Sequence, residues 1–239
     1  MSVSCQQVFK FKQFKVCQNQ QVMKVGTDGV LLGAWAHNNP INRILDVGTG
    51  TGLIALMLAQ KFQKALIDAI DINPYAVRLA QSNFLRSPWH NRLQAYLTDF
   101  NRFTTKVKYD LIVSNPPYFD ENILAKNKYR NKARHTGSLL TEQLIKKAAE
   151  LLQPYGSIQL ILPYAKTELI QNISKDNNLY INKLTNVKGN KNTEFKRILV
   201  KLSFEKKSPT DINHLVIEKQ RHVYTDSYIK LTRDFYLKM

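Results

Sequence analysis

Four consecutive residues carry the clearest chemical signal in this sequence: Asn115, Pro116, Pro117 and Tyr118. They follow the apolar run 109–114, which predicts a strand. An Asn side-chain oxygen and a backbone carbonyl can each accept one hydrogen of a planar amino group, and an aromatic ring can stack on its plane. The prolines fix φ and carry no N–H, so this stretch presents carbonyl oxygens without competing donors. A slot for a flat, amino-bearing group is one interpretation, and a proline-rich turn is the other.

A glycine-rich turn lies upstream of this motif. Gly48, Gly50 and Gly52 alternate between a short predicted strand at 43–47 and an apolar helical pattern. Glycines at such a turn permit positive φ and let a ligand approach the backbone closely. The spacing is neither that of the dinucleotide motif nor that of a phosphate-binding P-loop. Asp46 stands beside the glycines, where a carboxylate suits a cationic ammonium better than a pyrophosphate. A tight strand-to-helix turn without a ligand is the alternative.

Acidic residues mark the ends of the next two predicted strands. Asp71 ends one of them, and a carboxylate in this position can hold two ribose hydroxyls. Asn73 already provides an N-cap for the next helix, which begins with a proline. Asp99 could accept a hydrogen bond from an adenine amino group, or it could be an ordinary loop aspartate. Because ligands bind at the carboxyl edge of open parallel sheets, we expect these residues to gather there with Asn115.

Strands that alternate with helical segments predict βαβ units and therefore an α/β fold. We expect a mostly parallel seven-stranded sheet with helices on both faces, completed by an antiparallel hairpin from 180–187 and 195–204. The other predicted strands are 43–47, 66–71, 93–98, 109–114 and 156–162, and the predicted helices are 28–36, 53–61, 74–86 and 141–152.

The length of 239 residues fits a single domain. We expect a cofactor-binding core at 22–205, a strand or hairpin at 1–21 and a C-terminal appendage at 206–239. The N-terminal aromatics, Phe9, Phe11 and Phe14, alternate with cations, and packing is the favoured reading over stacking on bases. The segment 224–239 reads as a helix.

The formal net charge is +17, with 35 Lys and Arg against 18 Asp and Glu. Such an excess is costly self-repulsion unless the partner is a polyanion, and nucleic acid is the first candidate. Two groups of cations stand out as RNA-binding candidates, although a solvated loop remains the alternative for the first. They are Lys126, Lys128, Arg130, Lys132 and Arg134, expected in a loop after Tyr118, and Lys196 with Arg197, which Lys183, Lys188 and Lys191 accompany.

Several classes of protein are disfavoured by the sequence. It has no apolar run long enough to cross a membrane and no signal-peptide pattern at its start, which favours a cytoplasmic location. Cys5 and Cys17 form no C-x-x-C pair, and we expect them to be reduced thiols. The five scattered histidines suggest no metal site. The oligomeric state stays open, and a monomer is compatible with the sequence.

These motifs, in this order, resemble the Rossmann-like S-adenosylmethionine-dependent methyltransferases that act on amino groups and carry the NPPY signature. The segment 23–35 is similar to the helix before the first strand in bacterial tRNA adenine-N6 methyltransferases that modify adenine 37, 3′ of the anticodon, in a valine tRNA. The resemblance implies S-adenosylmethionine as cofactor and tRNA as partner. It also implies that Thr27 and Asp28 close over the methionine end of the cofactor.

Three alternatives remain at this stage. The NPPY motif also serves protein-glutamine N5-methyltransferases, but only about 42 residues precede the first core strand, and the charge favours RNA. An rRNA or DNA adenine-N6 methyltransferase is the second alternative, although no separate target-recognition domain is apparent. The third is an inactive RNA-binding protein, which would have no need of both the cofactor slot and the Asn115 slot.

Overall fold

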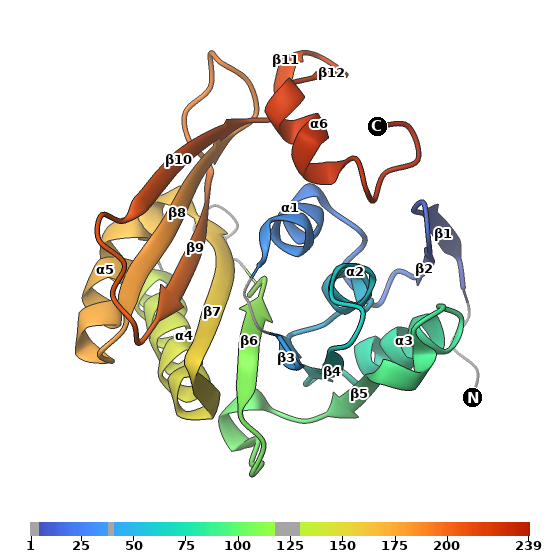
Figure 1. The fold of residues 1–239 in the computed structure, drawn as a ribbon, viewed down its shortest axis with the longest axis horizontal. Coiled ribbons are helices and arrows are strands. Elements are labelled where there is room, and N and C mark those ends of the chain that lie inside the picture. Colours follow the sequence, from blue (N-terminus) through green and yellow to red (C-terminus); the bar gives the residue numbers. More distant parts are fainter. Residues whose placement is uncertain (1–4, 38–40, 118–129) are drawn as a thin grey trace.

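The computed structural model describes residues 5–37, 41–117 and 130–239, with the backbone alone for 130–139. Its centre is an eight-stranded sheet in the order β10-β8-β9-β7-β6-β3-β4-β5 (Figure 1). β5, β4, β3, β6 and β7 are parallel neighbours, whereas β9 is antiparallel to both β7 and β8. These strands are β3 Arg43–Val47, β4 Leu66–Asp71, β5 Leu93–Leu97, β6 Tyr109–Ser114, β7 Leu152–Pro163, β8 Tyr180–Lys188, β9 Arg197–Ser203 and β10 Asp211–Val216.

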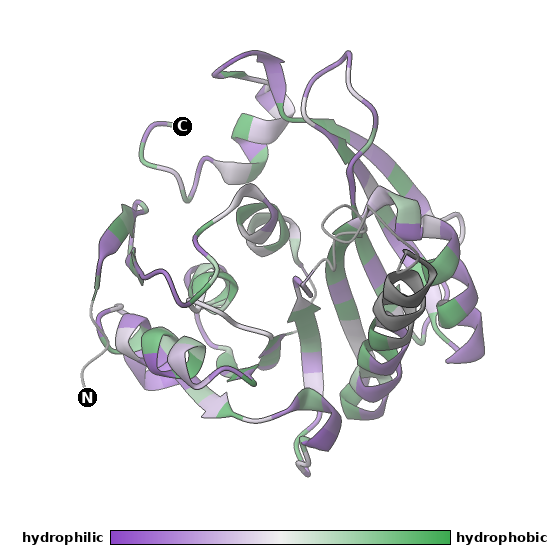
Figure 2. Ribbon diagram, turned by 180° about the vertical axis from the view of Figure 1, so that it is seen from behind, coloured by the Kyte–Doolittle hydropathy of each residue, from purple (hydrophilic) through white to green (hydrophobic). Residues whose placement is uncertain are grey.

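Helices cover both faces of the sheet. One buried cluster joins the sheet to α1, α2, α3, α6 and the N-terminal hairpin, and a second joins its other face to α4 and α5. Figure 2 shows hydrophobic residues concentrated on the strands at the middle of the sheet. The helices are α1 Thr27–Trp35, α2 Leu53–Lys61, α3 Pro74–Leu85, α4 Arg130–Leu151, α5 Thr167–Asp176 and α6 Asp226–Thr232, with short 3-10 helices at η1 His90–Arg92, η2 Phe100–Arg102 and η3 Tyr164–Lys166.

The predicted α/β arrangement is confirmed, and the strand count is one higher than expected. The additional strand is β10, which pairs in parallel with β8 and lies in the segment expected as a C-terminal appendage. Its first four residues are exposed, so it lacks the apolar run that identifies a buried strand. The amphipathic helix α5 was also not expected, and α6 is much shorter than the predicted helix at 224–239.

The N-terminal hairpin packs against the C-terminal end of the chain. It consists of β1 Gln7–Lys10 and β2 Lys15–Gln18, and a second small hairpin, β11 Glu218–Gln220 with β12 Val223–Tyr224, precedes α6. Phe11 and Phe14 are buried, and the Phe11 backbone forms a bridge with Tyr236. Packing rather than base stacking is therefore confirmed for these two aromatics.

The expectation of reduced thiols is wrong: a disulfide joins Cys5 to Cys17, with 5.5 Å between their Cα atoms. The two cysteines are twelve residues apart in sequence. In the β1–β2 register Val8 lies opposite Cys17, so the ladder itself does not pair the two cysteines. Cys5 precedes β1, next to Gln6, whose N–H donates to the Gln18 carbonyl, and this stretch brings it beside Cys17. A spacing rule for C-x-x-C pairs does not detect a pair that is brought together across a hairpin.

Within the described ranges, no helix is both long and apolar enough to cross a membrane.

Candidate active site

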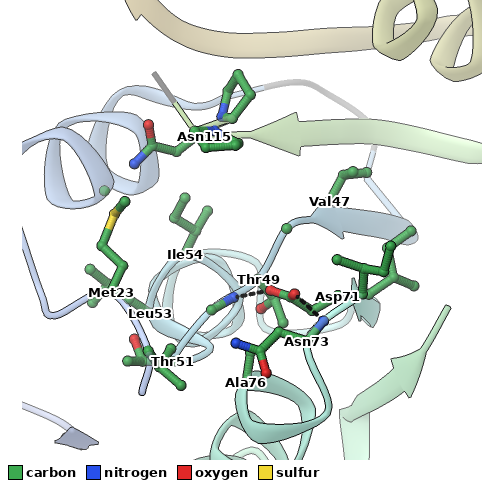
Figure 3. A pocket seen from close by; sticks show the side chains of 18 of the residues that line it. Met23, Val47, Thr49, Thr51, Leu53, Ile54, Asp71, Asn73, Ala76 and Asn115 are labelled. Atoms are coloured by element: carbon green, nitrogen blue, oxygen red, sulfur yellow. Dashed lines mark hydrogen bonds between the residues drawn. The ribbon is translucent and has the colours of Figure 1, made fainter. Parts of the chain in front are cut away.

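A cavity of about 800 Å³ opens at the carboxyl edge of the parallel strands. This volume lies in the range of small-molecule and cofactor sites. Its walls come from the ends of β3, β4 and β6, from the residues after β5, and from the segment that leads into α1 (Figure 3). The predicted site residues that line it are Thr27, Asp28, Gly48, Gly50, Asp71, Asp99, Asn115, Pro116 and Pro117.

The turn between β3 and α2 places three glycines in the left-handed region, as their spacing suggested. Gly48 has a φ of +73°, and an added Cβ there would meet nothing within 4 Å, so the backbone faces open space beside the cavity. Gly52 has a φ of +81°, and its Cβ would lie 2.5 Å from the ring of the buried Phe84. Gly48 therefore leaves room for a ligand, whereas Gly52 lets α2 and α3 pack closely and does not line the cavity.

Asp46 does not line the cavity either. Its side chain is fully buried behind the turn, where Oδ2 accepts hydrogen bonds from the Thr49 hydroxyl at 2.7 Å and the Ala55 N–H at 3.2 Å. Burial raises the pKa of Asp46 from 3.8 to about 7, against these two hydrogen bonds and with help from the charge of Asp71. The residue supports the turn from behind instead of meeting an ammonium group directly.

Asp71 joins the glycine turn to the start of the next helix. Its Oδ2 accepts from the Gly50 N–H at 2.9 Å, and its Oδ1 accepts from the Asn73 N–H at 2.8 Å (Figure 3). Asn73 caps α3, as predicted, by accepting from the Tyr75 N–H. The two bonds fix the carboxylate in the cavity wall, and each oxygen keeps a lone pair that can accept from a ligand hydroxyl.

Asp99 lies in the cavity wall after β5 and caps η2 by accepting from the Asn101 N–H. The neighbouring Phe100, together with Ile72 and Met23, adds apolar wall to the cavity, and none of these three residues was predicted. Ile72 and Met23 are each 70% exposed. Ile72 could have been predicted from the sequence. It directly follows the aspartate that ends a strand, and a large aliphatic residue in that position lies outside the buried core.

Asn115 lies at the end of β6, next to the glycine turn. The Ser114 hydroxyl donates to the Val47 carbonyl at 2.8 Å, which ties the end of β6 to the end of β3. The Asn115 side chain is half-buried and lies on the cavity wall together with Pro116 (Figure 3). Tyr118 lies outside the described residues. The motif and the glycine turn, predicted separately, thus meet in one cavity.

The start of α1 forms another wall of the cavity. Thr27 and Asp28 line it, and neither caps the helix. Asp28 is paired with Arg197 at the start of β9, with 2.9 Å between Arg197 Nε and Asp28 Oδ2. The ion pair fixes the first turn of α1 to the sheet and neutralises one of the cavity carboxylates.

The predicted RNA-binding cations fall into three situations. Lys126 and Lys128 lie outside the described residues. Arg130, Lys132 and Arg134 belong to the first turns of α4, where a loop was expected. Lys196 is exposed, whereas Arg197 is half-buried by its pairing with Asp28. Among the residues whose side chains are described, no group of three or more His, Cys, Asp or Glu could hold a metal ion.

Comparisons with known proteins identify the family. The methyltransferase small domain model matches residues 23–175. The tRNA1(Val) (adenine(37)-N6)-methyltransferase of Christiangramia forsetii is 45% identical over 238 residues, which cover 98% of this chain and 99% of that protein. The protein of the same name from Flavobacterium psychrophilum is 46% identical over 236 residues, 97% of this chain and 100% of its own.

Solved structures of low sequence identity share the fold. A predicted O-methyltransferase from Agrobacterium tumefaciens superposes with a TM-score of 0.67 at 18% identity, over 87% of this chain and 96% of its own. A glycopeptide N-methyltransferase complexed with S-adenosyl-L-methionine has a TM-score of 0.54 at 11% identity, over 76% of this chain and all of its own. The predicted Rossmann-like methyltransferase fold is confirmed. The chain belongs to the methyltransferase small domain family, alongside the bacterial tRNA1(Val) (adenine(37)-N6)-methyltransferases that it matches over almost its whole length.

Proposed function

We propose that this protein transfers a methyl group from S-adenosylmethionine to N6 of an adenine in tRNA, at position 37 of tRNA1(Val). The observation that carries the proposal is the meeting of Asn115 and Pro116 with the glycine turn and Asp71 in one cavity. The full-length similarity to enzymes of that name selects the substrate among the amino groups that such a site could accept.

The cavity suits S-adenosylmethionine in its size and in the groups that line it. Its volume of about 800 Å³ is ample for a nucleoside with an amino-acid tail, and the open space beside Gly48 allows close approach to the backbone. Asp71 has free lone pairs for ribose hydroxyls, and Asp99 can accept from the adenine amino group. Apolar walls from Ile72 and Phe100 can enclose the adenine ring. When bound, the cofactor supplies an electrophilic methyl group on a sulfonium.

Asn115 and Pro116 act on the other reactant. An adenine amino group is planar because its lone pair is delocalised into the ring, and it is therefore a weak nucleophile. Acceptance of its two hydrogens by the Asn115 side-chain oxygen and the Pro116 carbonyl favours a pyramidal nitrogen and directs the lone pair toward the methyl group. Alignment and charge placement then provide most of the rate enhancement. The methylated ammonium loses its proton to water, so no histidine base is needed.

The direct test is methyl transfer from labelled S-adenosylmethionine to unmodified tRNA1(Val), followed by nucleoside mass spectrometry. N6-methyladenosine at position 37 is the expected product. A matched transcript with guanosine at position 37 should accept no label. Label in rRNA or in a protein glutamine, with none in tRNA, would support methylation of an amino group and contradict tRNA as the substrate. Transfer to none of these acceptors would favour an inactive RNA-binding protein.

A further inference from the structure

Three aromatic rings follow one another at the surface, outside the residues that line the cavity, with one pair tilted and one pair stacked. The rings of Tyr164 and Phe195 are 5.4 Å apart with 33° between their planes, and those of Phe195 and His214 are 5.0 Å apart with 23° between their planes. The residues come from three segments that are distant in sequence: η3, the connection between β8 and β9, and β10. We call Tyr164, Phe195 and His214 the ring ladder.

The ring ladder does not belong to the core of the molecule. Tyr164 is 39% exposed, His214 is exposed and Phe195 is half-buried. None of the three is part of the two large buried clusters or packs against them as a partly buried neighbour. Contiguous exposed apolar surface can serve as an interaction site, and aromatic rings there can stack on a flat ligand.

The ring ladder lies on the same edge of the sheet as Asn115. Tyr164 directly follows the carboxyl end of β7, and its N–H donates to the carbonyl of Lys196 at the start of the antiparallel β9. Phe195 belongs to the β8–β9 connection, which extends beyond the ends of the strands (Figure 1). Since β7, β9, β8 and β10 follow β6 in that order, about 4.8 Å apart, the ladder begins one strand away from Asn115 and continues outward.

Cations accompany the rings. Lys188 Nζ lies 5.4 Å from the centre of the Phe195 ring, and Lys191 and Lys196 are exposed on the same connection. The exposed Glu194 is the only acidic residue between Lys188 and Arg197. Flat rings with lysines beside them provide the two contacts that a single-stranded nucleic acid needs, one for base faces and one for phosphates.

We propose that the ring ladder is a stacking platform for unpaired RNA bases next to the adenine held at Asn115. The inference rests on the proposed function, because a target adenine in a loop has single-stranded neighbours on both sides. Extrusion of the target base unstacks those neighbours, and the ladder offers them new stacking partners along the sheet edge that carries Asn115. The lysines hold the connecting phosphates.

The test compares exposed tyrosines on opposite edges of the sheet. Tyr164→Ala removes a ring of the ladder, and Tyr180→Ala, at the amino end of β8, is the matched control with 45% exposure. Affinity for unmodified tRNA1(Val) transcript is measured for each variant at several salt concentrations. We expect Tyr164→Ala to weaken binding about 5- to 100-fold, Tyr164→Phe to restore it, and Tyr180→Ala to bind as the unaltered protein does.

The salt dependence separates stacking from charge. Tyr164→Ala should leave the slope of log K against log salt unchanged, because no phosphate contact is lost. Lys188→Ala should reduce the slope by about 1. His214→Ala, which truncates an exposed ring, should repeat the Tyr164→Ala result. Affinity for S-adenosylmethionine should stay constant in all these variants.

The platform is overturned if Tyr164→Ala binds tRNA as tightly as Tyr180→Ala, or if it loses cofactor affinity by the same factor as tRNA affinity. The unaltered protein provides the separate check on the proposed function. If it methylates tRNA while the ladder variants bind normally, only the platform fails. If it methylates no tRNA and also fails to bind it, the proposed function and the platform fail together.

Discussion

Asn115 is the residue on which the proposed reaction depends most directly, because its oxygen accepts from the reacting amino group and not from the cofactor. We expect Asn115→Ala to lower kcat at least about 100-fold, the usual cost of losing one preorganised partner in the transition state. Affinity for S-adenosylmethionine should change little. Single-turnover methyl transfer and calorimetric titration of the cofactor measure the two quantities. The control is Asn91→Ala, at an exposed residue in η1, and an equal loss of cofactor affinity in Asn115→Ala would contradict the assignment.

Asp46 makes a second prediction at the level of a single residue, concerning stability. Its pKa is about 7 in the folded protein against an ordinary 3.8, so between these values the folded protein holds a proton that the unfolded chain has released. The free energy of unfolding therefore falls as the pH rises through this window. The stabilisation that comes from the raised pKa of Asp46 is fully present below pH 3.8 and is lost above pH 7.

Urea unfolding at a series of pH values, in the absence of ligand, tests this with Asp46→Asn as the comparison. The asparagine has no carboxyl group to titrate. The stability of the unaltered protein relative to Asp46→Asn should fall by on the order of 3 to 4 kcal/mol from pH 4 to pH 8. If the free energies of unfolding of the two proteins changed in parallel from pH 4 to pH 8, Asp46 would be charged in the folded state over that whole range.

The elements show why some of the site was predictable from sequence. β3, β4 and β6 are short segments rich in apolar residues that end in glycines, in an aspartate before a helix cap, or in Asn-Pro, and their observed bounds equal the predicted ones. Strand ends of a parallel sheet share an edge, so Asp71, Asp99 and Asn115 could be placed together. The burial of Asp46 was not predictable, because strand alternation does not show which side of a tight turn a flanking carboxylate takes.

Contacts between distant elements were beyond the reach of sequence patterns. The pairing of Arg197 with Asp28 joins residues 169 positions apart, and each looked like a ligand-binding residue by itself. The start of α4 at Arg130 was missed because nine residues with five cations favour a loop. The edge strand β10 was missed because its side chains are largely solvated.

The glycine turn allows a matched pair of substitutions at the scale of elements. Both Gly48→Ala and Gly52→Ala introduce a side chain at positive φ, which costs about 1–2 kcal/mol. Gly52→Ala also forces a Cβ against the buried Phe84 ring, and overpacking adds about 1–3 kcal/mol. We therefore expect Gly52→Ala to be the less stable variant in urea unfolding. Gly48→Ala should instead show the larger loss of cofactor affinity per unit of stability lost, and the reverse order would contradict their assigned roles.

The Asp28–Arg197 pair gives a second prediction at this scale. Its atoms are 2.9 Å apart, but the two side chains remain 26% and 32% exposed, so solvent screens the pair. A double-mutant cycle with Asp28→Asn and Arg197→Gln should give a coupling energy for unfolding of about 0.5–1 kcal/mol. Both single variants should weaken cofactor binding, because the pair holds the first turn of α1 against the cavity. Additive effects on stability would show that the two elements are not coupled through this pair.

At the scale of the whole molecule, the net charge of +17 predicts that salt affects the affinity for tRNA much more than the affinity for S-adenosylmethionine. A tRNA that contacts six or more phosphates should lose about a thousandfold or more in affinity between 50 and 200 mM salt. S-adenosylmethionine meets fixed carboxylates and backbone groups within a cavity, where screening is weaker, and its affinity should change less than about threefold. Titrations of both ligands at three salt concentrations make the comparison. If tRNA affinity proved as insensitive to salt as cofactor affinity, the excess of cations would have a role other than binding RNA.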